Sequence, residues 1–257
     1  MEFISWKLDE GVAIATINRP PANALSQQLV QELDELLTQL EQNNDVRVIV
    51  LHGEGRFFSA GAAIKEFTDL ETKSEAEKLA DNGQTVFERL ETFTKPVIAA
   101  VHGAALGGGL ELAMSCHIRY VAHDAKLGLP ELNLGIIPGF GGTQRLPRYV
   151  GMAKAAEIMF TGEPISGREA VEWGLANKAF EAEELLPKTL ELAKKIASKS
   201  PVSIKAVLVA LQYSKTASFQ EGIKAEAELF GKVFESQDAK EGIEAFIEKR
   251  QPTFSGK

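Results

Sequence analysis

The chain has 257 residues, and its hydrophobic (44%) and charged (25%) fractions are typical of a globular protein with one or two domains. Its formal net charge of −8 weighs against nucleic acid or an anionic membrane as a partner. Cys116 is the single cysteine, so an internal disulfide is excluded, and no apolar run approaches the ~18 residues that span a bilayer. Residues 1–7 lack the features of a signal peptide. We therefore expect a cytoplasmic protein without a membrane anchor.

The first part of the chain alternates between strand and helix patterns. Branched and small residues alternate from Val12 to Ile17, which predicts a strand. A helix with Ser26 as its N-cap is predicted next, because leucines recur at helical spacing until Asn43. A polar helix is predicted from Ser74 to near Phe93. Further strands are predicted from apolar runs at residues 46–51, 97–101 and 118–122.

The last part of the chain is mostly helical in pattern. A short strand is predicted at 177–180. Helices are predicted near residues 152–160, 166–173, 183–198, 202–212, 219–235 and 239–250. Strands that alternate with helices early, followed by helices alone, indicate an α/β core with a helical tail. The amphipathic faces of that tail need a partner, either the core or another subunit.

A glycine-rich stretch between residues 103 and 131 is the centre of the functional interpretation. The predicted strand at 97–101 turns through Gly107, Gly108 and Gly109 into a helical pattern that carries Glu111 in its first turn. Backbone N–H groups at such a helix start have no partner in the helix and favour negative charge. Glu131 follows after a second apolar run and a proline. Free amides with two carboxylates nearby in sequence suggest acid–base chemistry on a polarised carbonyl.

These residues also admit other interpretations. A lone glutamate on a helix is usually a solvated surface residue, although both glutamates here have apolar neighbours, which can raise a carboxyl pKa. The glycine runs fit neither a dinucleotide fingerprint nor a Walker loop. Ser59 is not in a nucleophile elbow, because Phe57 stands where glycine is needed. The four histidines have no metal-ligand spacing, so no metal site is expected.

The motifs taken together resemble the enoyl-CoA hydratase (crotonase) family over essentially the whole chain. Asn18-Arg19-Pro20 and the closing segment 246–250 match the family as well. The segments that carry most of the resemblance are 58–66 (FSAGAAIKE), 104–113 (AALGGGLELA) and 130–139 (PELNLGIIPG).

The resemblance implies an α/β fold, namely a crotonase-like spiral of β-β-α units followed by a helical trimerisation region. It divides the chain into a core with the active site at 1–195 and an oligomerisation region at 196–257. It also implies a homohexamer built as a dimer of trimers. The implied substrate is a coenzyme A thioester, with no metal or redox cofactor.

The resemblance also implies roles for individual residues. The backbone N–H groups of Ala62 and Gly108 correspond to the family's oxyanion hole. For the conversion of an enoyl-CoA to a 3-hydroxyacyl-CoA, we assign Glu131 to the C2 proton and Glu111 to the attacking water, and a sharing of both tasks between the two glutamates stays open. The residues implied in coenzyme A binding are Ala62, Ala63, Ile64, Lys65, Gly108, Phe230 and Lys249.

Two positions depart from the family pattern. Ala63 stands where an aspartate is common after the oxyanion-hole alanine, and His117 stands where an aspartate often follows the first glutamate. These departures leave the preferred acyl chain open. Two alternatives to hydration remain: another reaction of the superfamily, such as isomerisation or cleavage of a branched acyl-CoA, and a non-catalytic member that binds RNA or a protein.

Overall fold

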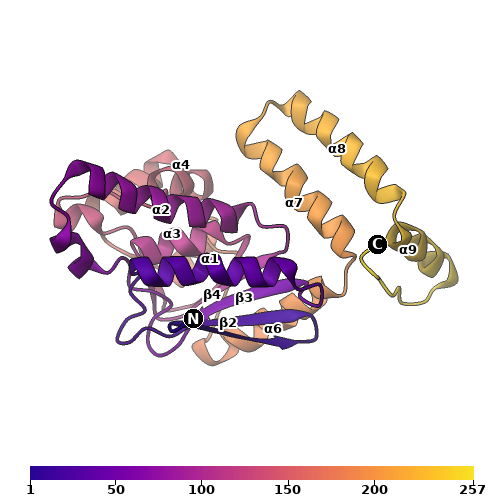
Figure 1. Cartoon of the computed structure of the whole chain (residues 1–257), viewed down its shortest axis with the longest axis horizontal. Coiled ribbons are helices and arrows are strands. Elements are labelled where there is room, and N and C mark those ends of the chain that lie inside the picture. The colour runs from indigo at the N-terminus through magenta and orange to yellow at the C-terminus, as the bar shows by residue number, and fades with distance from the viewer.

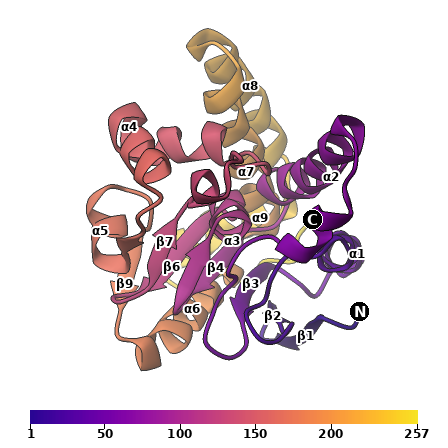
Figure 2. The ribbon, with the colours of Figure 1, turned by 90° about the vertical axis from the view of Figure 1, so that its left-hand side faces the viewer.

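A computed structural model of the chain describes residues 1–257, with every side chain except that of Asp69. The chain forms two sheets with helices on both sides (Figures 1 and 2). The larger sheet has the strand order β1 (Ile4–Asp9), β2 (Val12–Ile17), β3 (Val48–Gly53), β4 (Val97–Val101), β6 (Ile118–Ala122) and β9 (Lys178–Phe180). The smaller sheet has the order β5 (Ala104–Leu106), β7 (Lys126–Gly128) and β8 (Ile165–Ser166).

The larger sheet is parallel from β2 to β9, with β1 added antiparallel at its edge. Strands β2, β3 and β4 are apolar and almost fully buried, as expected for parallel strands covered on both faces. One face packs against α6 (Ala182–Ala197), and α1 (Gln27–Gln42) lies on the other face beneath α2 (Lys73–Glu91) (Figure 1). These layers confirm the predicted α/β fold class.

Of the remaining helices, α3 (Gly108–Ser115) and α5 (Gly167–Glu172) pack against the smaller sheet, and the last three extend away from both sheets. Short helices also follow the strands at η1 (Ile64–Asp69) and η2 (Glu131–Leu134). Helix α4 (Gly142–Thr161) is interrupted at Gly151, whose φ of 77° is not helical. Within the described residues, no helix combines the length and apolar character that crossing a bilayer requires.

We call the last three helices the helical arm: α7 (Pro201–Thr216), α8 (Phe219–Phe234) and α9 (Gln237–Glu248). In Figure 1 α7 and α8 form a hairpin that stands away from the sheet, with α9 and the C-terminus at its base. Large apolar side chains on the arm are open to solvent, for example Phe230 (71%) and Phe246 (85%). Helix α6, which packs on the sheet, continues to Ala197 and so slightly past residue 195.

Most predicted elements are confirmed, with one error at a helix start. Ser26 caps α1 as predicted, and its hydroxyl accepts a hydrogen bond from Leu29 N. Ser74 does not cap α2, because Thr72 does so in a capping box with Glu75. The helix predicted near 152–160 matches the part of α4 that follows the kink at Gly151, whereas the part from Gly142 to the kink was not predicted. Strands β1, β5, β7 and β8 were not predicted, and all but β1 have only two or three residues.

Candidate active site

The segment after β3 brings two backbone amides together. Leu25 N donates to Gly61 O (2.7 Å) and Ala63 N donates to Leu25 O (2.9 Å), so the amide of Ala62 points away from that pairing. Gly61 has a φ of 105°, and a Cβ on it would lie only 2.9 Å from Leu106 O and 3.7 Å from Gly108 N. The backbone around Ala62 is therefore a close neighbour of the start of α3.

The start of α3 also requires glycine for close approach. A Cβ on Gly109 would lie 2.2 Å from Ser59 O, which leaves no room for a larger residue. Gly108 is the first residue of α3, where amides lack a partner within the helix. Among the described residues, no acceptor takes a hydrogen bond from Gly108 N or Ala62 N. Both residues line the same cavity, so two free donors are available to a bound ligand.

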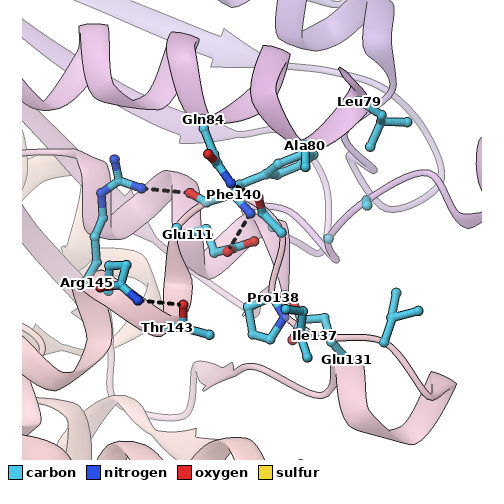
Figure 3. A pocket seen from close by; sticks show the side chains of 18 of the residues that line it. Leu79, Ala80, Gln84, Glu111, Glu131, Ile137, Pro138, Phe140, Thr143 and Arg145 are labelled. Carbon is cyan, nitrogen blue, oxygen red and sulfur yellow. Dashed lines mark hydrogen bonds between the residues drawn. The ribbon is translucent and has the colours of Figure 1, made fainter. Parts of the chain in front are cut away.

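Glu111 lies one turn further along α3 and is 1% exposed. Its Oε1 accepts a hydrogen bond from Phe140 N at 2.9 Å (Figure 3). It also accepts one from Gly142 N, at 2.7 Å, at the start of α4. The pKa of Glu111 is raised to about 7, chiefly by burial and also by the negative charge of Glu131. The hydrogen bonds from the two amides oppose this rise but are the weaker influence. A carboxyl group with this pKa can exchange a proton at neutral pH.

Glu131 approaches the cavity from η2, directly after Pro130. A Cβ on Gly107 would lie 3.0 Å from its Oε1, so this carboxylate lies beside the start of α3. Its Oε2 is buried and has no hydrogen-bond partner among the described residues. Burial raises the pKa of Glu131. Figure 3 shows Glu111 and Glu131 in one cavity, carried by different elements.

The cavity has a volume of about 1420 Å³ and lies between α2 and the segment that joins η2 to α4. Its apolar lining includes Leu79, Ala80, Ile137 and Pro138 (Figure 3). Phe140 forms part of the wall. Its ring contacts Phe87 edge to face at 5.4 Å between centroids, and it passes so close to Gly83 that a Cβ there would lie 2.4 Å away. Such an apolar lining suits an apolar part of a ligand.

The structure brings together most of the predicted site residues. Ala62, Ile64, Gly108, Glu111 and Glu131 all line the cavity. Ala63 and Lys65 lie in the same segment as Ala62 but are not part of the lining. Phe230 lies on α8 and Lys249 follows α9, and neither lines this chain's own cavity.

His117, one of the two departures from the family pattern, does not line the cavity. Its Nδ1 accepts a hydrogen bond from Val97 N (3.0 Å), and burial lowers its pKa to about 4. A neutral imidazole therefore supports the start of β4. The sequence assigns no role to the amides of Phe140 and Gly142, which hold Glu111.

The pKa of Glu111 predicts a pH dependence of stability. Because burial raises this pKa from 4.5 to about 7, the folded chain binds more protons than the unfolded chain between these values. The contribution of Glu111 to the free energy of unfolding therefore falls as pH rises through this window, by on the order of 3 kcal/mol. We expect Glu111→Gln to lose less stability than the wild type between about pH 5 and about pH 8, measured by urea unfolding. Parallel pH dependences in the two proteins would contradict this expectation.

Comparisons with known proteins agree with this geometry. The sequence profile described as Enoyl-CoA hydratase/isomerase matches residues 7–257. The chain is 58% identical to a probable enoyl-CoA hydratase of Bacillus subtilis, over 100% of both chains. It is 45% identical to a short-chain-enoyl-CoA hydratase of Clostridium acetobutylicum, over 93% of this chain and 92% of the relative. A crystal structure of an enoyl-CoA hydratase from Bacillus anthracis superposes with a TM-score of 0.95 at 38% identity, covering 99% of this chain and all of the other.

Proposed function

Since the chain belongs to the enoyl-CoA hydratase/isomerase family, as its motifs predicted, we propose that it hydrates a trans-2-enoyl-CoA to a 3-hydroxyacyl-CoA. The observation that carries this proposal is the cavity itself. Two carboxylates, from α3 and η2, share it with two free backbone amides. Retention of both glutamates favours hydration over reactions that need a single carboxylate.

The amides of Ala62 and Gly108 have the first role in this mechanism. Addition of water to the double bond shifts negative charge onto the thioester oxygen, which becomes enolate-like. Two donors that already lack protein partners can receive that charge without reorganising. Each donor of this kind contributes on the order of 3 kcal/mol to transition-state stability.

The carboxylates supply and remove protons. Glu111, which the amides of Phe140 and Gly142 hold in place, takes a proton from water as the water oxygen bonds to C3. Glu131 delivers a proton to C2, which carries the developing negative charge. Burial raises both pKa values, and the charge of Glu131 opposes ionisation of Glu111, which favours a state with one ionised and one protonated carboxyl group. No net proton is gained or lost over the addition.

The proposal is tested by following the loss of the conjugated enoyl absorbance with crotonyl-CoA. We expect a steady-state kcat in the range usual for enzymes, and product with one added water. Failure to hydrate crotonyl-CoA or any longer enoyl-CoA, with consumption of another acyl-CoA, would replace hydration by another reaction of the superfamily. A series of chain lengths compared by kcat/KM identifies the preferred acyl group.

The ring of Phe140 in the cavity wall supports a preference for short chains, as in the name of the Clostridium relative.

The coenzyme A part of the substrate would lie along the segment that follows Ala62. Ile64 is half exposed and lines the cavity, and the neighbouring Lys65 is exposed and carries a positive charge that suits phosphate groups. Phe230 and Lys249 lie on the helical arm, outside this chain's cavity, so we propose that they contact coenzyme A only from another copy of the chain.

The exposed apolar side chains of the arm support a homo-oligomer, and we propose a hexamer arranged as a dimer of trimers. Phe246 is 85% exposed in the single chain, which is costly unless another copy covers it. We expect Phe246→Glu to lower the mass measured by light scattering, because a charge at a packed interface opposes association. Phe160→Glu is the control, since Phe160 is 75% exposed but lies on α4, outside the arm. An unchanged mass for Phe246→Glu, or an equal loss for both variants, would contradict this role of the arm.

We also propose that the protein works in the cytoplasm, in a pathway such as fatty acid β-oxidation that consumes enoyl thioesters. Cys116 is buried at the end of α3, and burial raises its pKa to about 12, which makes it an inert thiol.

A further inference from the structure

A second set of hydrogen bonds holds the segment whose backbone amides donate to Glu111. The amides of Phe140 and Gly142 that bind Glu111 lie at the start of α4. The carbonyl of Phe140 in turn accepts a hydrogen bond from Arg145 Nη1 at 2.7 Å (Figure 3). The Phe140 segment is therefore bound both by the Glu111 carboxylate and by the Arg145 guanidinium, and Arg145 and Glu91 line the same cavity.

Arg145 is itself fixed. It is 8% exposed, and its Nε donates to Glu91 Oε2 at 2.7 Å. Burial acts to raise the pKa of Glu91, but its hydrogen bonds to Lys215 and Arg145 hold that pKa below its usual value. An ionised carboxylate with two charged donors forms strong and directional bonds, so Arg145 has little freedom to move.

Glu91 also joins this set of bonds to the helical arm. Its Oε1 accepts from Lys215 Nζ at 2.7 Å, and its backbone carbonyl accepts from Gln212 Nε2 at 2.9 Å. Both donors are on α7. A continuous series of hydrogen bonds therefore runs from the arm through Glu91 and Arg145 to the amide that holds Glu111.

We propose that Arg145 is a positioning residue for Glu111, and that Glu91 fixes Arg145 and ties its placement to helix α7. This inference rests on the proposed hydration, in which Glu111 removes a proton from water. Arg145 does not touch the substrate in this scheme. It holds the Phe140 segment so that two amides converge on one carboxylate oxygen, and the carboxylate is thereby aimed into the cavity.

The test measures crotonyl-CoA hydration by Arg145→Gln over a range of pH. Misplacement of a catalytic group by as little as 1 Å can cost about 10²-fold in rate, so we expect a loss of that order in kcat, with KM changed by less than about 3-fold. The acid limb of the kcat/KM profile should move to higher pH. Ionised Glu111 then has less well-placed donors and lacks the nearby positive charge, and Glu131 on η2 still opposes its ionisation.

Glu91→Gln separates positioning from charge. It leaves the charge of Arg145 beside Glu111 but removes the carboxylate that holds the guanidinium, so kcat should fall by roughly 10-fold without the alkaline shift. The double variant should lose no more activity than Arg145→Gln alone, because Glu91 acts through Arg145.

Arg89→Gln is the matched control for general loosening of α2. Arg89 lies on the same helix as Glu91 and pairs with Asp34 (2.7 Å) and Glu41 (3.0 Å), outside the cavity lining. We expect its kcat and pH profile to match the wild type. An equal loss in Arg89→Gln, or wild-type kcat and profile in both Arg145→Gln and Glu91→Gln, overturns the inference while the wild type still hydrates crotonyl-CoA. If Arg145→Gln does not fold, Glu91→Gln alone decides. If the wild type does not hydrate any enoyl-CoA, the proposed function itself fails.

Discussion

Glu111→Gln is expected to lower kcat for crotonyl-CoA hydration by about 10²- to 10⁴-fold, the usual contribution of a general base. The substitution is nearly isosteric, and a Gln oxygen can still accept from Phe140 N and Gly142 N. The cavity wall and KM should therefore change little, while the side chain can no longer take a proton from water. Steady-state kinetics at saturating substrate measure the effect.

Glu32 provides a matched control for this substitution. It is also a buried glutamate whose carboxylate accepts two backbone amide bonds, from Phe3 N (2.7 Å) and Ile4 N (3.1 Å). It does not line the cavity. We expect Glu32→Gln to retain wild-type kcat whatever it does to stability. Near-normal turnover by Glu111→Gln would remove Glu111 from the mechanism.

Glu131→Gln is expected to reduce kcat by a similar factor, for the opposite reason. Its buried Oε2 has no hydrogen-bond partner in the part of the chain that the structure describes, so it can hold the proton that is delivered to C2. An amide has no proton of suitable acidity to deliver. The double variant with Glu111→Gln should lose far less than the product of the two single losses, because the groups act as a unit.

The pH profiles of the two variants should also differ. Hydration needs Glu111 ionised, so the rate rises with pH through a pKa near 7, which burial sets. Hydration also needs Glu131 protonated, so the rate falls again as the pH passes the raised pKa of Glu131. Residual activity of Glu131→Gln should keep only the rising limb, and that of Glu111→Gln only the falling one. The reverse pattern would exchange the two assigned roles.

The sequence was informative wherever structure is encoded by neighbouring residues. The strand Val97–Val101 and the cap at Ser26 follow from local apolar pattern and local hydrogen bonding, and both match the structure. The start of α4 could not be found in this way. Gly141 offers no side-chain cap, and the first amide of the helix is instead bound by Glu111, which comes from α3. A cap supplied by a residue distant in sequence leaves no local pattern.

The same distinction applies to the site. Glu111, Gly108 and Ala62 were identified because each stands in a short motif, and the structure places them around one cavity with Glu131. Arg145 and Glu91 are separated by more than 50 residues and meet only because α2 and α4 both pack against α3, so no spacing rule indicates their ion pair. Phe230 and Lys249 followed from the family resemblance alone, and their roles stay predictions that depend on another copy of the chain.

Oε1 of Glu111 accepts hydrogen bonds from the backbone at the start of helix α4. The same carboxyl group takes the proton from water in the proposed reaction. Natural variation at this position is therefore constrained twice. An alanine or a shorter aspartate would remove chemistry and helix anchorage in one step, whereas glutamine removes only the chemistry. A descendant of this protein that abandons hydration can keep its architecture most easily by passing through glutamine.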